Sequence, residues 1–363
     1  MPSKKRPDYF LIFAIGSLLI AGMVALLSSS SIESQKDFGN VYSYFTHQIT
    51  FGLAVGLFAA VVTYSINYTK WKTLALPLFI LCVFLLILVF IPEVSIKTGG
   101  ARRWINVLGV SLQPSEFLKL GFIIYLAAFF SGRKNVIGKW SQGFIPFLLI
   151  SGLVGILIIL QPDVGTLGVI MMTSALMYFV AGANLFQIGA LIPVGLGLLA
   201  ILIKLAPYRM QRLTSFLNPS EDPQGISYQI NQALLAVGSG GILGVGVGKS
   251  LQKYHFLPEP MKDSIFAIWA EELGFVGAVL LICLFLFFAF RGLKVARNAD
   301  DRFGKLVACG IVFWITTQAF VNIGSMLGLM PLTGIPLPFI SYGGSAMVTT
   351  LAGMGILVNI SKH

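Results

Sequence analysis

The chain has 363 residues, of which 56% are hydrophobic and 11% are charged, and its mean hydropathy is +0.86. These values exclude an ordinary soluble globular protein and indicate a polytopic membrane protein. The net charge of +11 comes from basic residues spread over the loops between apolar runs, without a patch of interleaved aromatic side chains, which argues against nucleic-acid binding.

Apolar runs recur along the whole sequence. A transmembrane helix needs about 20 mostly apolar residues, and the alternating ~10-residue strand pattern of a membrane barrel is absent. We therefore predict an all-α protein with a single membrane domain over residues 1–363 and about ten transmembrane helices. The predicted spans cover residues 10–29, 48–66, 72–92, 114–131, 143–160, 164–182, 185–204, 264–290, 305–328 and 341–360.

The Lys and Arg residues predict how these spans are oriented. An even number of spans places both termini on one side of the membrane. If that side is the cytoplasm, the inner segments hold 14 of the 25 basic residues and the short outer loops hold 4. Cytoplasmic loops normally carry this excess, so we expect both termini to be cytoplasmic. A large loop of about residues 205–263 then lies outside, as do 97–116, 161–163 and 328–344.

Several polar residues stand out on the outer side. Arg102 and Arg103 lie in a short outer loop, either as a solvated pair or as guanidinium groups that bind the oxygens of a diphosphate. In the next span, Glu116 and Lys119 are three residues apart and share a helix face. They form either a local ion pair or a site where Lys119 faces an anionic ligand.

The segment GSGGILGVGVGKS contains Gly-Lys-Ser but does not match a phosphate-binding loop. That motif requires glycine at the position of Leu243. We expect this segment, and the irregular PLTGIPLPF, to be flexible or re-entrant backbone packed against the spans. Two broken stretches on one face predict a cavity there.

Cysteine and histidine contribute little to the functional interpretation. Cys82, Cys283 and Cys309 lie inside apolar runs without CxxC spacing, so we expect buried, inert thiols. The three histidines are dispersed without the spacing of metal ligands.

Carboxylates gather in FLPEPMKDSIFAIWAEELGF, where the eighth span begins. Asp263 is either a helix cap or a general base held at the membrane surface, and Glu259 precedes it. Glu271 lies about 12 Å further along the helix at about 80° from Asp263, whereas Glu272 points nearly the opposite way. Burying a carboxylate inside a membrane span costs free energy, so we expect each of these glutamates to face a cavity or a cationic partner. They either form a structural ion pair or have a functional role.

Five segments together resemble the SEDS family, which comprises FtsW, RodA and SpoVE. The similarity covers nearly the whole chain, with the motifs in the expected order. Two stretches, NPSEDPQGISYQ and GVGVGKSLQKY, resemble FtsW more than RodA. The five segments are GGARRWINVLGVSLQPSEFLKL, QPDVGT, FLNPSEDPQGISYQINQALLAVGSGGILGVGVGKSLQKYHFLPE, DSIFAIWAEELGFVG and GLMPLTGIPLPFISYGGS.

The resemblance implies a peptidoglycan glycosyltransferase that polymerises lipid II on the outer face of the bacterial cytoplasmic membrane, in cell division or elongation. It also implies a class B penicillin-binding protein as partner, among other divisome or elongasome proteins. The family's essential aspartate maps onto Asp263, and its conserved pair in the fourth span maps onto Glu116 and Lys119. The chain departs from the family at Met261–Lys262, where His-Thr is usual, and at Ser345–Ala346, where two serines are common.

This reaction requires a base and positive charge. The attacking sugar hydroxyl is a poor nucleophile, so Asp263 is predicted to act as its general base. The departing undecaprenyl diphosphate gathers negative charge, which cationic side chains or a divalent cation such as Mg²⁺ or Mn²⁺ would stabilise; no tightly bound cofactor is expected. A single base and a diphosphate donor suggest inversion at the anomeric carbon.

A lipid II flippase or another transporter is the alternative function, because broken helices and intramembrane charges also fit that class. Against it, the charges gather on the outer side and no internal repeat is evident. The residues predicted to bind substrate are Arg102, Arg103, Glu116, Lys119, Asp163, Glu259, Glu271, Ser341 and Tyr342.

Overall fold

The structure is a computed structural model that describes residues 6–98, 101–107, 110–133, 135–205, 207–218, 225 and 227–362. Its elements, in chain order, are α1 (Tyr9–Phe38), α2 (Ser43–His47), the π-helical segment η1 (Gln48–Ala54), α3 (Val55–Ser65), α4 (Lys70–Leu88), β1 (Ser95–Thr98), β2 (Ala101–Val107), β3 (Val110–Leu112), α5 (Pro114–Ser131), the π-helical segment η2 (Trp140–Phe144), α6 (Ile145–Ile159), α7 (Val164–Val180), α8 (Leu185–Leu205), α9 (Pro207–Leu217), α10 (Tyr228–Ser239), α11 (Ile265–Asn298), α12 (Arg302–Met326) and α13 (Gly344–Ile360).

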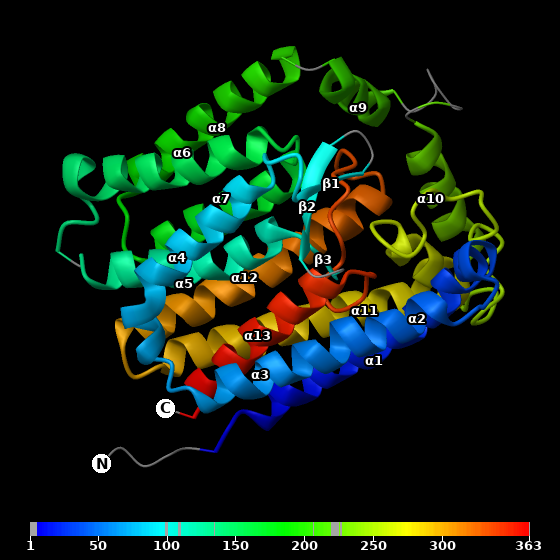
Figure 1. The fold of residues 1–363 in the computed structure, drawn as a ribbon, viewed down its shortest axis with the longest axis horizontal. Helices are drawn as coiled ribbons and strands as arrows, with labels where there is room; N and C mark the ends of the chain where they lie inside the picture. Colours follow the sequence, from blue (N-terminus) through cyan, green and yellow to red (C-terminus); the bar gives the residue numbers. More distant parts are fainter. Residues whose placement is uncertain are drawn as a thin grey trace.

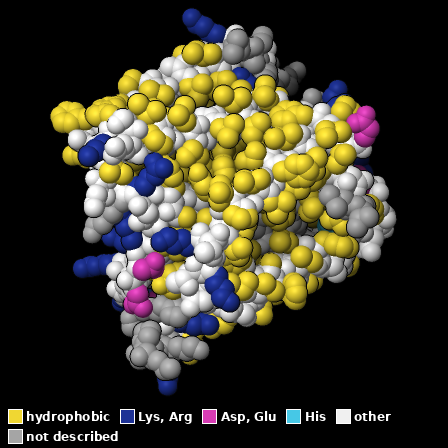
Figure 2. All heavy atoms as spheres, turned by 60° about the vertical axis from the view of Figure 1, so that its left-hand side comes forward, with side chains coloured by type: hydrophobic (Ala, Val, Ile, Leu, Met, Phe, Trp, Pro, Cys, Tyr) yellow, Lys and Arg dark blue, Asp and Glu magenta, His cyan; other side chains and the backbone are white. Residues whose placement is uncertain are grey.

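The helices confirm the predicted membrane architecture. Within the described residues, eight helical segments are long and apolar enough to cross a membrane, and α7 and α13 are shorter apolar helices. Together they correspond to the ten predicted spans. Two of them are much longer than predicted: α1 runs on to Phe38 and α11 to Asn298. Figure 2 shows a broad surface of hydrophobic side chains with Lys and Arg gathered along its margin, as expected for a protein surrounded by lipid.

Both termini lie at the same end of the helical bundle (Figure 1). The backbone N–H of Asp8 donates to Ser361 Oγ over 3.1 Å, and Arg291 Nη2 lies 2.5 Å from Asp8 Oδ2. The N-terminal end of α1 is thereby joined to the C-terminal ends of α11 and α13. The prediction that the two termini share one side is therefore confirmed.

The bundle has a central and a peripheral part. Helices α5 and α12 are the most buried of the long helices, and they pack against each other and against α7 and α13. Helix α8 is the least buried; it packs chiefly against α9 and α7 and lies at the edge of the molecule (Figure 1). Cys82 and Cys309 are buried as predicted, whereas the prediction for Cys283 is wrong, because it lies on an exposed face of α11.

A small sheet forms between α4 and α5, at the end of the bundle opposite the termini (Figure 1). Strands β1, β2 and β3 are antiparallel in that order, with a bulge between Ile96 and Lys97. This stretch was predicted only as part of an outer loop, without strands. The aromatic and β-branched residues of β2, Trp104, Ile105 and Val107, are of types that favour strands.

Helix α11 is broken near its beginning. Gly274 has φ 66° and ψ −166°, which interrupts the helical hydrogen bonds. The glycine-rich segment 240–246 lies against this break and supplies backbone partners: Val245 N donates to Glu271 O over 3.0 Å, and Phe275 N donates to Gly241 O over 2.8 Å. A Cβ atom on Gly244 would lie 2.1 Å from Glu272 O, so only glycine permits this approach. The predicted packing of this segment against the spans is confirmed.

Candidate active site

Asp263 lies just before the first turn of α11 and its side chain is only 9% exposed. Gln229 Nε2, on α10, donates to Asp263 Oδ2 over 3.2 Å and lies 3.0 Å from Ser264 Oγ. The N-cap residue of α11 is Ser264, and its side chain caps no backbone N–H. The geometry therefore does not support helix capping as the role of Asp263, whose carboxylate is directed to α10 instead.

The backbone of Asp263 is fixed by a buried amide. Asn322 Nδ2, on α12, donates to Asp263 O and to Ile335 O, each over 2.8 Å. These two hydrogen bonds, one from each N–H of the amide, join the start of α11 to the irregular segment 330–340. That segment passes beside the carboxylate, since a Cβ atom on Gly334 would be 3.9 Å from Asp263 Oδ2. Three parts of the chain that are distant in sequence therefore meet at one buried carboxylate.

Ser341 and Tyr342 position the residues immediately before Asp263. Ser341 Oγ donates to Lys262 O over 2.5 Å, and Tyr342 N donates to Met261 O over 2.9 Å. The Tyr342 hydroxyl also lies 3.0 Å from His47 Nδ1. Both residues were predicted to bind substrate, and the structure shows them making contacts that hold the candidate base in place.

Backbone strain accompanies these contacts. Glu259 and Phe339 have φ values of 49° and 66°, in the left-handed region that side chains other than glycine rarely adopt. One lies four residues before Asp263 and the other two residues before Ser341. Strain of this kind is common at functional sites, where the surrounding packing maintains it.

Burial raises the pKa of Asp263 to about 6, and the negative charge of Glu259 adds to the increase. The hydrogen bond from Gln229 and the positive charge of Lys262 act in the opposite direction and are smaller. Lys262 Nζ is paired with Glu259 Oε2 at 2.9 Å, and both side chains are about half exposed. At neutral pH the Asp263 carboxylate is thus mostly ionised but close to its pKa, as a general base requires.

Glu116 and Lys119 form a buried ion pair within α5, and Lys119 also contacts α12. Lys119 Nζ lies 2.8 Å from Glu116 Oε1 and 2.8 Å from Gln318 Oε1. Gln318 Nε2 in turn donates to Pro336 O over 2.8 Å, next to the segment that surrounds Asp263. An adjoining pocket of about 10 Å³ has room for roughly one water molecule. In this structure Lys119 is therefore enclosed and connects α5 to the 330–340 segment.

The two predicted arginines have different surroundings. Arg103 Nε donates to Gln161 O over 3.1 Å, and its Nη2 donates to Pro162 O, so this side chain holds the sheet against the turn before α7. Arg102 is exposed and stands opposite Lys97 in the neighbouring strand. Like charges in directly opposed positions destabilise a sheet, so an anion that bridges Arg102 and Lys97 would be favourable.

The sheet is connected to the Asp263 region through the start of α13. Gln113 N donates to Ser345 Oγ over 3.1 Å, four residues after Ser341. Asp163, which was also predicted to bind substrate, accepts a hydrogen bond from Thr166 N over 3.2 Å and so caps α7. Asp163 therefore has a structural role in this arrangement.

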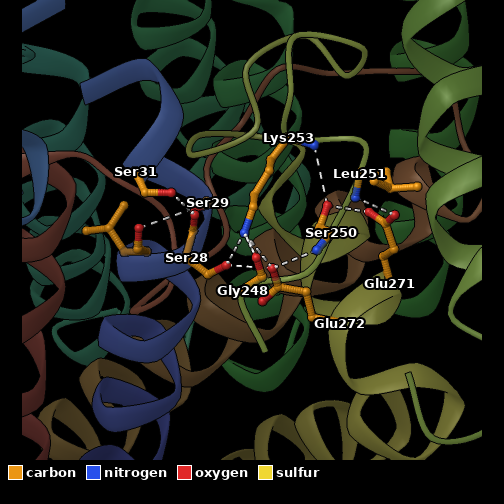
Figure 3. Close-up of polar contacts among 10 residues, drawn as sticks. Ser28, Ser29, Ser31, Gly248, Ser250, Leu251, Lys253, Glu271 and Glu272 are labelled. Carbon is orange, nitrogen blue, oxygen red and sulfur yellow. Dashed lines mark hydrogen bonds and ion pairs between the residues drawn. The ribbon is translucent and has the colours of Figure 1, made fainter. Parts of the chain in front are cut away.

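Glu271 and Glu272 both bind the 247–253 loop, which directly follows the glycine-rich segment 240–246 (Figure 3). Glu271 Oε1 accepts from Leu251 N over 3.0 Å, and its Oε2 accepts from Ser250 Oγ. Glu272 Oε1 pairs with Lys253 Nζ at 3.1 Å. The expected cationic partner is thus confirmed for Glu272, whereas Glu271 is satisfied by neutral donors.

This network extends to α1. Ser28 Oγ lies 2.5 Å from Glu272 Oε1 and 3.0 Å from Lys253 Nζ, which also donates to Gly248 O over 2.6 Å. All the charged groups are buried. The Ser28–Lys253–Glu272 network therefore holds the 247–253 loop in place between α1 and the broken start of α11.

Sequence reasoning missed Gln229, Asn322 and Lys253. Gln229 and Asn322 are polar residues of α10 and α12, and Lys253 lies in the loop between α10 and α11. Gln229 lies within the quoted GISYQINQ stretch. Their roles depend on contacts between residues 34, 59 and 19 positions apart, respectively. No periodicity in one sequence reveals such pairings.

Two further expectations concern a cavity and metal ions. One pocket lies beside Lys119 and another at the end with the termini; neither lies beside Asp263, so the outer cavity stays a prediction. In the part of the chain that is described, no three His, Cys, Asp or Glu side chains form a group that could hold a metal ion.

Comparison with known proteins supports the resemblance across the whole chain. Residues 9–363 match the family model FTSW_RODA_SPOVE, described as "Cell cycle protein". Stage V sporulation protein E of Bacillus subtilis is 42% identical, over 99% of this chain and 98% of that protein. The probable peptidoglycan glycosyltransferase FtsW of Geobacter metallireducens is 37% identical, over 99% of this chain and 96% of that protein.

Two solved structures share the fold. One is a chain from a structure described as "Structural coordination of polymerization and crosslinking by a peptidoglycan synthase complex". It superposes on this protein with a TM-score of 0.79 at 29% identity, and the match covers 98% of this chain and 97% of that one. The rod shape determining protein RodA of Thermus thermophilus superposes with a TM-score of 0.72 at 28% identity, covering 98% of this chain and 96% of that one.

Proposed function

Because the chain belongs to the cell cycle protein family of FtsW, RodA and SpoVE, we propose that it is a peptidoglycan glycosyltransferase that polymerises lipid II into glycan strands. Several relatives, from Geobacter and Coxiella among others, are named as probable peptidoglycan glycosyltransferases. The single observation that carries the mechanism is the buried Asp263 carboxylate, whose pKa is raised to about 6.

In the proposed reaction, Asp263 accepts the proton of the acceptor sugar hydroxyl. That oxygen then forms a bond to the anomeric carbon of the donor, and the bond from that carbon to the undecaprenyl diphosphate oxygen breaks. A positioned base of this kind contributes about 10²–10⁴ in rate. Attack on the face opposite the leaving group inverts the anomeric configuration.

The leaving diphosphate needs positive charge on the same side of the membrane as Asp263. Arg102 is the arginine best placed to bind the diphosphate, because it is exposed and lies opposite Lys97. Arg103 instead donates hydrogen bonds to backbone carbonyl oxygens. The described residues offer no group of three metal ligands, so we assign no step to Mg²⁺ or Mn²⁺. The enclosed Lys119 is proposed to act through the position of the 330–340 segment.

We also propose the orientation and partner. The distribution of Lys and Arg places both termini in the cytoplasm and Asp263 on the outer side, where a lipid-borne glycan substrate would be consumed. The fold is shared with a chain of a peptidoglycan synthase complex that coordinates polymerization and crosslinking. A class B penicillin-binding protein, which crosslinks glycan strands, is the partner we propose on this ground.

Purified protein and labelled lipid II in detergent test the function directly. Glycan polymer is expected to form, with more product when a class B penicillin-binding protein is added. A flippase would produce no polymer, because detergent leaves no compartments between which a lipid can be moved. Absence of polymer both with and without the partner would contradict the proposal, provided that the melting temperature shows a folded protein.

A further inference from the structure

A pocket of about 420 Å³ opens at the end of the bundle where the termini meet, away from the Asp263 region. Its walls come from three parts of the chain: residues 6–10, the last turns of α11 and the end of α13. Its volume falls within the range of ordinary small-molecule sites, about 300–1,000 Å³. Nothing in the proposed polymerisation mechanism uses this pocket.

The charges that line the pocket are not balanced. Arg6 and Arg291 face a single carboxylate, Asp8. That carboxylate is already engaged twice: its Oδ1 accepts from Leu11 N over 2.9 Å and its Oδ2 accepts from Arg291 Nη2 over 2.5 Å. The Nε atom of Arg291 is buried and has no hydrogen-bond partner among the described residues. A buried guanidinium nitrogen without a hydrogen-bond partner is uncommon in folded proteins, and a bound anion beside the guanidinium group would explain it.

The surroundings of the pocket are apolar on the side of α1. Tyr9 and Phe10 line it and are 63% and 62% exposed, and Arg291 lies over the Phe10 ring at 4.9 Å from its centroid. Exposed aromatic side chains in the first turn of a membrane helix lie where headgroups meet acyl chains. The occupant must therefore combine an anionic group with an apolar part.

We propose that this pocket binds the phosphate headgroup of an anionic phospholipid from the leaflet that faces the termini. The phosphate oxygens accept hydrogen bonds from the guanidinium groups of Arg6 and Arg291. The acyl chains run along the exposed rings of Tyr9 and Phe10. Basic pockets between membrane helices are a recurrent form of lipid headgroup site. Such a lipid would join α1, α11 and α13 at the end opposite Asp263.

The test is native mass spectrometry of the purified full-length protein with equimolar phosphatidylglycerol and phosphatidylcholine that carry identical acyl chains. Wild-type protein is expected to retain phosphatidylglycerol preferentially. Arg6→Gln removes an exposed guanidinium and is expected to reduce that preference about fivefold. Asp8→Asn with Arg291→Gln removes both members of the ion pair, keeps an asparagine that can cap α1, and is expected to abolish the preference.

The matched control is Arg297→Gln, which removes the same charge from an exposed position of α11 that does not line the pocket. It is expected to retain the wild-type preference. Thermal melting with added phosphatidylglycerol, glycerol 3-phosphate or inorganic phosphate separates a lipid site from a site for a soluble anion. Only the lipid is expected to raise the melting temperature of wild-type protein.

Three results would overturn the proposal. The first is equal retention of the two lipids by wild-type protein. The second is stabilisation by glycerol 3-phosphate or inorganic phosphate that equals stabilisation by phosphatidylglycerol. The third is a wild-type lipid preference in both pocket variants while they melt normally.

Discussion

The side-chain amide of Gln229 lies 3.2 Å from Asp263 Oδ2, so that a helix of the large loop holds the carboxylate at the beginning of α11. The same amide is 3.0 Å from Ser264 Oγ. The hydrogen bond from Gln229 lowers the pKa of Asp263, against the larger effect of burial, which raises it. Helix α10 therefore both orients the proposed base and limits how far its pKa rises.

Gln229→Ala should move the acid limb of the pH–rate profile to higher pH. Loss of the hydrogen bond removes an interaction that favours the ionised carboxylate, so the pKa of Asp263 rises above about 6. The measurement is lipid II polymerisation across pH 5–9 with Gln232→Ala, on the same helix, as control. A profile identical to that of wild-type protein would show that Gln229 does not act on the base.

Glu259→Gln and Lys262→Met should shift the acid limb in opposite directions. The charge of Glu259 raises the pKa of Asp263 and that of Lys262 lowers it. Removing Glu259 therefore allows Asp263 to ionise at lower pH, and removing Lys262 requires higher pH. Both side chains are about half exposed, so the shifts should be small and should shrink in high salt. Shifts in the same direction would be inconsistent with Asp263 as the titrating group.

Lys253→Met should destabilise the protein strongly. It leaves the buried Glu272 carboxylate without its cationic partner at 3.1 Å, and breaking a buried pair typically costs about 3–5 kcal/mol. Removing both charges with Lys253→Met and Glu272→Leu should recover much of this loss. Lys249→Met, at an exposed position of the same loop, should stay within about 0.5 kcal/mol. The measurement is thermal melting of wild-type protein, Lys253→Met, the double variant and Lys249→Met. A melting temperature of Lys253→Met equal to that of wild-type protein would show that the Ser28–Lys253–Glu272 network does not stabilise the fold.

The orientation can be tested by cysteine labelling with a membrane-impermeant reagent. In a variant without Cys82, Cys283 and Cys309, Tyr254→Cys should react in intact cells. Arg297→Cys, on the same side as the termini, should react only after lysis. Both positions are exposed in the structure. The reverse pattern would place the termini outside and would remove Asp263 from the side where we propose that lipid II is polymerised.

The sequence predicted the spans because each is an apolar run of the length that a membrane requires. It did not predict the sheet at 95–112, because short strands between membrane helices give little periodic signal. The break at Gly274 was missed for a different reason. A single glycine in an apolar helix is common, and only the backbone of the 240–246 segment, which hydrogen-bonds there, shows that the helix is interrupted.

The candidate site was predicted in part. The sequence predicted that Asp263 lies at the outer end of a span. It did not predict the tertiary contacts that Gln229, Asn322 and Ser341 make with Asp263 and its neighbour Lys262. The structure also separates residues that looked alike in the sequence. Arg102 is exposed, whereas Arg103 is engaged by carbonyl oxygens.

Asp263→Asn tests the central claim most directly. Asparagine keeps the size of the side chain but cannot accept the proton, so the rate should fall by about 10²–10⁴. Folding should not suffer. The pKa of Asp263 is raised in the folded state, so ionisation opposes folding as pH rises from about 4 to about 6.

At pH 7.5 the neutral asparagine should therefore melt at the same temperature as wild-type protein or higher, with the difference shrinking near pH 4. The decisive measurement is polymerisation of labelled lipid II by purified wild-type and Asp263→Asn proteins of matched melting temperature. We predict near-complete loss of glycan product in the variant. Retention of more than about a tenth of the wild-type rate would contradict the assignment of Asp263 as the general base.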